Sequence, residues 1–340
     1  DIVFPFKRYQ IQPVWRADRP QKGRFQEFYQ CDADVVGSKS LWQEVEFIQL
    51  YDAVFSDLNL KGVTIKINNR KILAGIAELI GAQDKLIDFT VALDKLDKIG
   101  EVKVKEEMLA KGISNEGISK LQPLFNLTGS FNEQLQSLKS ILNTSIEGIK
   151  GVEELEFIAS SVASIGLKSA SLQMDVTLAR GLNYYTGAIF EVSAPADVPM
   201  GSIGGGGRYD DLTGIFGLKD VSGVGISFGL DRIYLVLEEL NLFPSNKATA
   251  TKVLFVNFGS EESLYCLRAI SCLRSKNIAS ELYPDFVKIK KQMVYCNKRE
   301  IPFVVMVGAS EIAQNKYLFK DMHTGEQKLL TLEELTETVS

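Results

Sequence analysis

Three arginines in this 340-residue chain stand where strands are expected to end, in positions suited to phosphate binding. Arg16 opens the segment RADRPQKGR, which holds four cations within nine residues. Arg180 lies between an expected strand and a glycine, and Arg232 follows GISFGLD, where a strand is expected to lead into a helix. Because guanidinium groups offer paired donors to phosphate oxygens, the pattern favours a polyanion. The alternative for the Arg16 segment is a solvated hairpin loop that protects a sheet edge.

Two further segments indicate a pocket for a small polar ring. LARGLNYYTG (178–187) carries paired tyrosines, whose flat apolar faces end in a hydroxyl. GGGGRYD (204–210) begins with four consecutive glycines, which are costly to order and are expected where a ligand or another backbone approaches closely. The alternatives are a tyrosine-rich surface strand for the first segment and a flexible loop for the second.

The segment GVGISFG (223–229) partly matches two known sequence motifs. Its glycine spacing differs from that of the dinucleotide fingerprint G-x-G-x-x-G. Part of it matches the nucleophile elbow G-x-S-x-G, but a triad would need the single histidine, His323, which we expect in a polar hairpin turn. We therefore interpret the segment as a strand that feeds a helix whose first turn directs Arg232 at a phosphate.

The reaction class follows from which residues are expected beside these arginines. No histidine base or activated nucleophile is expected beside them, so the site favours a reaction driven by positioning and by neutralisation of phosphate charge. Attack of a substrate carboxylate on the α-phosphate of ATP is such a reaction, because the carboxylate is already a nucleophile.

The composition is that of an ordinary globular protein. Hydrophobic residues make up 45% of the chain and the formal net charge is −5, so any RNA contact must come from a local basic patch. We find neither a signal-peptide pattern at the first residues nor an apolar stretch long enough to span a membrane. The four cysteines form no C-x-x-C pair, which disfavours a zinc site or a disulfide framework and indicates reduced thiols in the cytoplasm.

Periodicity predicts an α+β fold in which a helical piece interrupts an antiparallel sheet. Strands are expected at 7–16 and 24–36, and helices at 41–58 and 70–80. Strands that alternate with helices after residue 251 predict a small α/β domain with a largely parallel sheet. We divide the chain into the first part of the sheet domain (1–81), a helical insertion (82–150), the second part of the sheet domain (151–240), a linker (241–251) and the α/β domain (252–340).

Four segments resemble, in sequence and in order, the motifs of histidyl-tRNA synthetases, which are class II aminoacyl-tRNA synthetases. RADRPQKGRFQEFYQCDAD resembles motif 2, GISFGLDR resembles motif 3, and LARGLNYYTG and GGGGRYDDL resemble the two signatures of the histidine family. The resemblance covers essentially the whole chain. It implies an incomplete class II antiparallel-sheet catalytic core with a helical insertion, followed by an α/β anticodon-binding domain. The family begins with a further N-terminal segment that holds motif 1 and builds the dimer interface, so the resemblance also implies an N-terminal truncation and a homodimer for the full-length protein.

The resemblance implies a histidine–tRNA ligase that uses ATP and Mg²⁺, makes histidyl-adenylate and transfers histidine to tRNA(His). The alternative is a synthetase-like regulatory subunit that senses histidine without catalysis. Such paralogues typically lack the anticodon domain and lose motif residues, whereas this chain keeps both, which favours the enzyme.

Residue roles carry over at the matching positions. The resemblance implies catalytic roles for Arg16, Arg180 and Arg232. It implies ATP binding by Arg16, Arg24, Phe28 and Arg232. It implies histidine binding by Gln30, Asp34, Arg180, Tyr184, Tyr185 and Tyr209. It implies tRNA binding by Gln21, Lys22, Arg24, Lys288 and Lys291. No metal ligand is expected from the chain itself, and Asn183 replaces an aspartate that is common in the family.

A basic helix is expected at 285–299 in the C-terminal domain. Its lysines make contact with RNA plausible, and a solvated helix face is the alternative. We expect its buried face to consist of Phe286, Ile289, Met293 and Cys296.

Overall fold

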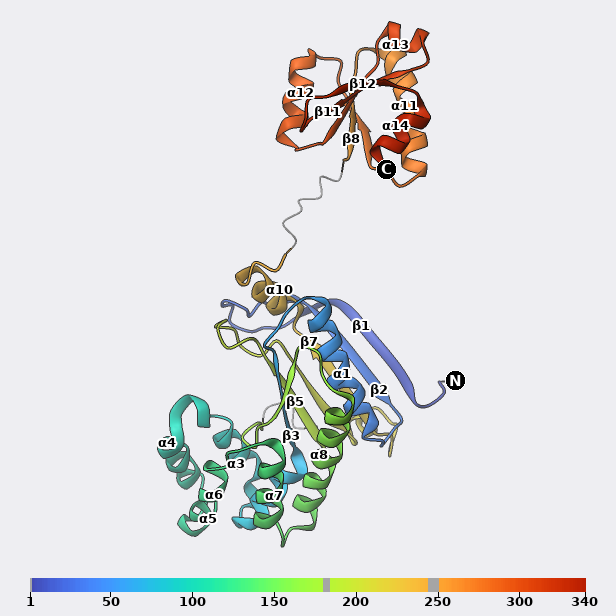
Figure 1. Cartoon of the computed structure of the whole chain (residues 1–340). Helices are drawn as coiled ribbons and strands as arrows, with labels where there is room; N and C mark the ends of the chain where they lie inside the picture. Colours follow the sequence, from blue (N-terminus) through green and yellow to red (C-terminus); the bar gives the residue numbers. More distant parts are fainter. Residues whose placement is uncertain (1, 180–183, 244–250) are drawn as a thin grey trace. The chain divides into compact units, whose positions relative to one another are not determined.

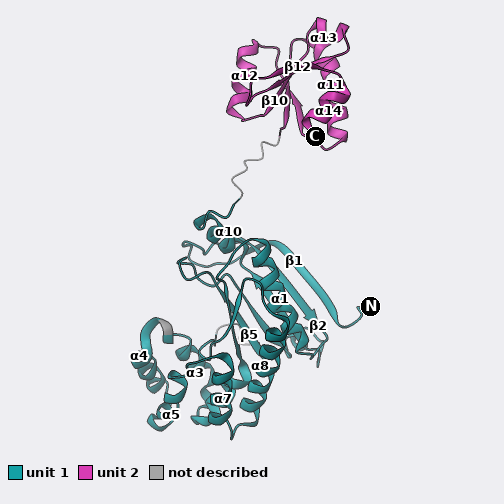
Figure 2. Cartoon of the chain, in the orientation of Figure 1, with its two compact units in different colours: residues 1–243 teal, residues 244–340 magenta. Residues whose placement is uncertain are grey.

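The computed structural model describes residues 2–179, 184–243 and 251–340 (Figure 1). The chain divides into two compact units, residues 1–243 and 244–340 (Figure 2). Most of the segment expected as a linker lies outside the described residues, as do Arg180 and Asn183.

Unit 1 is built on a seven-stranded sheet with the order β1-β2-β7-β6-β5-β3-β4. The strands are β1 (Phe6–Trp15), β2 (Glu27–Val36), β3 (Thr64–Asn69), β4 (Ser171–Met174), β5 (Ala188–Ser193), β6 (Gly204–Tyr209) and β7 (Gly223–Phe228). Neighbouring strands are antiparallel except for β3 and β4. The expected antiparallel sheet is therefore confirmed.

The β1–β2 hairpin forms one edge of this sheet, as the sequence alternation predicts. Its register pairs Gln12 with Gln30, and the ladder continues to Arg16, whose N–H donates to the carbonyl of Gln26. At the tip, Gln21 and Arg24 exchange backbone hydrogen bonds, and the turn closes through a glycine at position 23 with a φ of 71°, a conformation that favours glycine. Because side chains alternate along a strand, Arg16 and Gln30 project from the same face of the hairpin.

Two long helices, α1 (Trp42–Asp57) and α8 (Ile146–Ile165), pack side by side on one face of the sheet (Figure 1). The fully buried rings of Tyr51 and Phe55 on α1 contact Phe228 of β7. Helix α2 (Arg70–Leu79) crosses α8 at Gly75, where a Cβ atom would lie only 2.6 Å from the Cα of Gly148. The two glycines therefore let these helices meet backbone to backbone.

The shorter helices between α2 and α8 gather at one end of unit 1 (Figure 1). They are η1 (Gln83–Lys85), α3 (Leu86–Leu93), α4 (Leu96–Ala110), α5 (Asn115–Lys120), α6 (Gln122–Phe125) and α7 (Phe131–Ile141). Helix α8 runs without a break past residue 150, where we expected the helical insertion to end. Two helices flank β7 in sequence, the short α9 (Leu212–Ile215) and α10 (Leu230–Glu239).

Unit 2 is a five-stranded sheet with the order β12-β11-β10-β8-β9, covered by helices on both faces (Figure 1). The strands are β8 (Val253–Phe255), β9 (Ser280–Leu282), β10 (Phe303–Met306), β11 (Tyr317–Asp321) and β12 (Gln327–Leu330). The helices are α11 (Ser260–Ser275), α12 (Ile289–Lys298), α13 (Ala309–Ala313) and α14 (Leu332–Val339). Only β9, β8 and β10 are parallel, since β11 and β12 are antiparallel to their neighbours. The expected parallel arrangement is thus confirmed for three strands, and the hairpin expected around His323 follows them as β11 and β12.

The buried face of α12 differs from the one we expected. Cys296 is fully buried and Met293 partly buried, but Phe286 is 74% exposed and Ile289 is 42% exposed. The core position is taken instead by Gln292, which is fully buried. A polar side chain can occupy it because its amide is hydrogen-bonded on both sides.

His323 lies in the exposed turn between β11 and β12, as expected. Its backbone N–H donates to a carboxylate oxygen of Asp321 over 2.8 Å. All four cysteines are free, and burial raises the pKa of Cys266 to about 12 and that of Cys296 to about 11. Within the ranges that the structure describes, no helix is both long and apolar enough to cross a membrane.

Candidate active site

A cavity of about 340 Å³ opens on the sheet of unit 1. Ser227 and Phe228 of β7 both border it, and the ring of Phe228 packs against Tyr51 and Phe55 of α1, so the side chain of Ser227 points to the other face of the sheet. Since side chains alternate across a sheet, the cavity lies on the face opposite α1. The predicted site residues around it are Arg16, Arg24, Phe28, Gln30, Tyr185 and Arg232.

Arg16 extends over this cavity from the end of β1. Its guanidinium carbon lies 4.9 Å from the centre of the Phe28 ring, and Nη2 lies 3.5 Å from Oε1 of Gln30. The arginine is exposed and the aromatic face beneath it holds the guanidinium plane without consuming its donors. Arg16 is thus oriented and still able to bind an anion.

Arg232 lies in the first turn of α10, and its hydrogen bonds hold the loops that contain Gly23 and Ser202 beside the cavity. Its Nε donates to the carbonyl of Gly23 and its Nη1 to the carbonyl of Ser202, both over 2.6 Å. The preceding residue, Asp231, accepts the backbone N–H of Tyr29 over 2.9 Å. Together these bonds fix the start of α10 against the β1–β2 hairpin, so the positive end of that helix faces the cavity.

Arg24 and Lys22 belong to the hairpin tip, and each has an acidic neighbour. Nε of Arg24 lies 3.2 Å from the carboxylate of Asp18, and the exposed ammonium of Lys22 lies 3.8 Å from Glu239 on α10. Exposed pairs of this kind are weak and easily exchanged for a phosphate. Gln21, the neighbouring residue, lies at the same tip.

Asp34 and Tyr209 meet across β7. The hydroxyl of Tyr209 donates to Oδ1 of Asp34 over 2.8 Å, and Nη1 of Arg8 lies 3.5 Å from Oδ2. Burial raises the pKa of Asp34, although the Tyr209 hydrogen bond and the Arg8 charge oppose the shift. Burial likewise raises the pKa of Tyr209, so the phenol stays a donor.

The tyrosine cluster links this pair to the cavity. The Tyr184 ring centre lies 4.8 Å from that of Tyr185 and 6.2 Å from that of Tyr209, both edge to face. Tyr185 itself lines the cavity. Asp34, Tyr184 and Tyr209 do not line the cavity themselves, and Tyr185 connects them to it.

The glycine run forms strand β6 and not the flexible loop that was the alternative, and its glycines leave room on both faces of the sheet. A Cβ at Gly205 would meet only the carbonyl of Phe190, at 3.1 Å, and Gly205 lines the cavity, so its missing side chain leaves room for a ligand. A Cβ at Gly204 would lie 3.0 Å from the ring of Tyr51, whose hydroxyl donates to the carbonyls of Gly205 and Ser227 over 3.0 and 3.1 Å. The missing side chain of Gly204 thus leaves room for the buried Tyr51, whose hydrogen bonds support the strands that form the floor of the cavity.

Sequence comparison agrees with this geometry. Residues 6–233 match the family model described as "Histidyl-tRNA synthetase", and residues 252–340 match the one described as "Anticodon binding domain". The chain belongs to the histidyl-tRNA synthetase family. A histidine–tRNA ligase of Christiangramia forsetii is 68% identical over 97% of this chain and 72% of its own length, and one of Phocaeicola vulgatus is 58% identical over 100% and 74%.

Solved structures of the family share the fold. A histidyl-tRNA synthetase from Nostoc sp. superposes with a TM-score of 0.85 at 32% identity, over 100% of this chain and 78% of that one. A protein from Bacillus halodurans titled "ATP phosphoribosyltransferase regulatory subunit/histidyl-tRNA synthetase" gives a TM-score of 0.70 at 21% identity, over 86% of this chain and 72% of that one. The second likeness concerns the fold alone.

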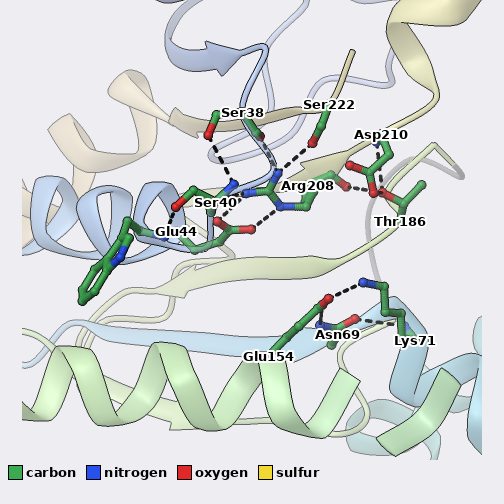
Figure 3. A network of polar contacts seen from close by, with 11 residues as sticks. Ser38, Ser40, Glu44, Asn69, Lys71, Glu154, Thr186, Arg208, Asp210 and Ser222 are labelled. Carbon is green, nitrogen blue, oxygen red and sulfur yellow. Dashed lines mark hydrogen bonds and ion pairs between the residues drawn. The ribbon is translucent and has the colours of Figure 1, made fainter. Parts of the chain in front are cut away.

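This family member also carries a buried ion pair that sequence reasoning missed (Figure 3). The guanidinium of Arg208, 4% exposed, binds both carboxylate oxygens of Glu44 on α1. It also donates to the carbonyls of Ser38 and Ser40 and to the hydroxyl of Ser222. Every N–H of the guanidinium is used, so Arg208 locks the glycine-rich strand to α1 rather than binding substrate. One signal was available, because Glu44 stands among residues of the buried helix face and such a charge needs a partner.

The remaining predicted residues fall outside this cluster. Arg180 lies outside the described residues of the family signature. Lys288 and Lys291 belong to unit 2, where both are exposed at the start of α12.

Proposed function

We propose that the protein is a histidine–tRNA ligase that joins histidine to ATP as histidyl-adenylate and then transfers histidine to tRNA(His). The observation that carries the proposal is the meeting of two kinds of residue at one cavity. Arg16 and Arg232 suit phosphate, and Tyr185 connects the same cavity to the Asp34–Tyr209 pair, which suits a ring with N–H donors. Membership of the family and the match to an anticodon-binding domain support it.

The imidazole of the substrate is assigned to Asp34, with Tyr209, Tyr184 and Tyr185 around it. A carboxylate that accepts an imidazole N–H fixes the tautomer and the ring orientation, and it penalises apolar side chains that leave it unpaired. Gln30, which lines the phosphate end of the cavity, is assigned to the α-amino group. Its position beside Arg16 brings the substrate carboxylate toward the nucleotide.

The activation step needs positioning and charge neutralisation. An oxygen of the histidine carboxylate attacks the α-phosphorus of ATP, the bond to the bridging oxygen breaks, and pyrophosphate leaves with that electron pair. Arg16 is proposed to hold the α-phosphate, with Arg180 on another side of it, and Arg232 to hold the γ-phosphate. Arg24 and Phe28 complete the proposed ATP site. Donors fixed before the reaction stabilise the charge that develops in the transition state.

Mg²⁺ fits this site as a companion of ATP. Glu191 and Asp231 line the cavity, and Mg²⁺ is commonly held by one or two carboxylates together with substrate phosphates. When bound, the ion neutralises charge on those phosphates. Among the described residues, no group of three or more histidine, cysteine, aspartate or glutamate side chains could hold a metal ion alone.

Pyrophosphate exchange into ATP tests the activation step. It is measured with each proteinogenic amino acid, on this chain and on a version extended to the length of its relatives. Exchange that depends on histidine alone is expected, and Arg16→Ala should lower it by about 100-fold or more, the usual effect of losing one transition-state donor. Arg19→Ala, an exposed cation of the same loop that does not line the cavity, is the matched control. Exchange with a different amino acid would contradict the proposal.

The alternative remains a histidine-sensing regulatory protein without catalysis. It is favoured only by the fold, which the Bacillus halodurans protein shares. Tight histidine binding by the extended protein without any exchange would establish it.

Partners and assembly follow from the same proposal. We infer that tRNA meets the hairpin tip through Gln21, Lys22 and Arg24, and meets unit 2 through Lys288 and Lys291. We also infer a cytoplasmic homodimer. Exposed apolar side chains on the edge strand support a contact with a second copy, because Tyr9 is 79% and Trp15 69% exposed. Light scattering of the extended protein tests this, and a monomer would refute it.

A further inference from the structure

Unit 2 exposes an aromatic ring beside a run of lysines. Phe286 precedes α12 and is 74% exposed, and Ile289 in the first turn is 42% exposed. Lys288, Lys290 and Lys291 alternate with these apolar residues and are exposed too. Phe286 and Ile289 together form an exposed apolar patch bordered by cations, and an apolar patch with a polar rim marks an interaction site.

The loop that carries Phe286 is firmly attached to the core. The buried amide of Gln292 accepts the N–H of Asn257 over 2.9 Å and donates to the carbonyls of Asn257 and Val287 over 2.9 and 3.0 Å. Nδ2 of Asn257 donates to the carbonyl of Pro284 over 3.1 Å. Both ends of the segment 284–287 are therefore held, and the ring is presented on a fixed support.

The lysines are available for a ligand. In the part of unit 2 that the structure describes, Lys288, Lys290 and Lys291 make no ion pair, whereas Asp285 is the one acidic neighbour within the loop. Cations that surround a flat apolar ring are the pattern by which proteins bind unpaired nucleotides, since the ring stacks on a base and the cations approach the phosphates. A duplex would not offer a free base face, and the match of this domain to an anticodon-binding family favours RNA over an acidic protein surface.

We propose that Phe286 stacks on an unpaired base of the tRNA loop that unit 2 binds, with Ile289 packed at the edge of that base and the three lysines on the flanking phosphates. The inference rests on the proposed function, because it takes tRNA as the substrate. It assigns the stacking to a residue outside the lysines already expected to contact RNA.

Equilibrium binding of a fluorescent tRNA(His) transcript to the whole chain tests the inference. Phe286→Ala should weaken binding about 5- to 100-fold, the range for the loss of one stacked base. Phe286→Trp should bind like the wild type, and Phe286→Leu should resemble Phe286→Ala, because leucine is apolar but has no π-face. A transcript that lacks the anticodon arm should bind all variants equally. Leu264→Ala, 59% exposed on α11, is the matched control and should change nothing.

The outcomes separate this inference from the ligase proposal. Equal affinities of wild type, Phe286→Ala and Phe286→Leu would overturn the stacking role, and so would a Phe286→Leu variant that binds like the wild type. A change in the sedimentation of Phe286→Ala with unchanged RNA affinity would assign the ring to a protein contact and also overturn it. Normal histidine-dependent exchange with any of these results leaves the ligase proposal intact. Absence of exchange with the expected binding pattern would defeat the ligase proposal alone.

Discussion

Tyr209 donates a hydrogen bond of 2.8 Å to Asp34, although β7 separates the strands that carry them. The contact is possible because β7 has glycine beneath both side chains. A Cβ at Gly223 would lie 2.1 Å from the Tyr209 ring, and a Cβ at Gly225 would lie 2.1 Å from Oδ1 of Asp34. The glycines of the GVG segment are thus explained by two side chains that lie over the sheet.

Tyr209→Phe should weaken histidine binding selectively. The lost hydrogen bond to a charged group is worth about 1.5–3 kcal/mol, which corresponds to roughly a 10- to 100-fold rise in the KM for histidine. The KM for ATP should stay within about twofold, because Arg16 and Arg232 are untouched. Since this hydrogen bond lowers the pKa of Asp34, its loss should also move the acid limb of histidine binding to higher pH. Steady-state exchange between pH 5 and 8 measures both effects, and equal changes in both KM values would contradict the assignment.

Gly225→Ala should have the same selectivity for a different reason. The new methyl group would displace the Asp34 carboxylate. The backbone φ of Gly225 is not in the left-handed region, so alanine does not strain the backbone there. We expect a loss of histidine binding of about 100-fold or more, with little change in the unfolding midpoint. Gly214→Ala, where a Cβ would meet nothing within 4 Å, is the matched control. A Gly225→Ala protein with normal histidine affinity would show that Asp34 does not bind the ring.

Much of this architecture was accessible from the sequence, because its signals are local. Alternation predicted the β1–β2 hairpin, and residue types and spacing singled out Arg16, Arg232 and the tyrosine pair, of which Arg16, Arg232 and Tyr185 line the cavity. The resemblance to the family, and not spacing, added the other lining residues Arg24, Phe28 and Gln30. The pairing of Glu44 with Arg208 was not accessible, since 164 residues separate them and no local pattern encodes the contact. Helical periodicity misassigned Phe286 and Ile289 as buried. Periodicity describes a face, but it does not say that a hydrogen-bonded glutamine occupies that face while the apolar residues stay outside.

Tyr51→Phe tests whether the cavity floor is supported from the side of α1. The hydroxyl of this fully buried residue is the donor to the carbonyls of Gly205 and Ser227, which belong to adjacent strands. Its removal should cost about 1–3 kcal/mol in the free energy of unfolding, because two buried carbonyls lose a partner. It should also raise both KM values while the pH profile of histidine binding stays unchanged, unlike that of Tyr209→Phe. Denaturant unfolding and exchange kinetics check this, and an unchanged KM for both substrates would reduce Tyr51 to a purely structural role.

Asp52→Asn tests how the loop before β4 is held. The Asp52 carboxylate on α1 accepts the N–H groups of Lys168, Ser169 and Ala170 over 2.7–2.9 Å. Burial alone would raise its pKa, but these hydrogen bonds hold the pKa below its usual value. A carboxyl with a depressed folded pKa stabilises the protein above its unfolded pKa, about 3.9, and this stability is lost as the pH falls through the folded pKa.

The variant should therefore be less stable by about 1–3 kcal/mol at pH 7, because the amide places N–H groups against N–H donors. The difference from the wild type should shrink below about pH 4 as the wild-type carboxyl takes up a proton. Chemical unfolding at pH 7 and pH 3 measures it. A stability difference that does not depend on pH would mean that the charge of Asp52 is irrelevant. Asp57→Asn, an exposed carboxylate at the end of the same helix, is the control.

The buried Glu44–Arg208 pair should stabilise the protein only while both partners are present. Both side chains are almost fully buried, at 0% and 4% exposure, so removal of one partner leaves an uncompensated charge in the core (Figure 3). Glu44→Gln should cost about 3–5 kcal/mol in the free energy of unfolding, and Arg208→Met a similar amount. The double variant should lose much less than the sum, since no unpaired charge remains, and a double-mutant cycle by denaturant unfolding measures that coupling. Strict additivity would show that the two charges do not depend on each other. A coupled pair, with residual exchange activity that tracks the folded fraction, would place Arg208 in the frame of the site rather than in its chemistry.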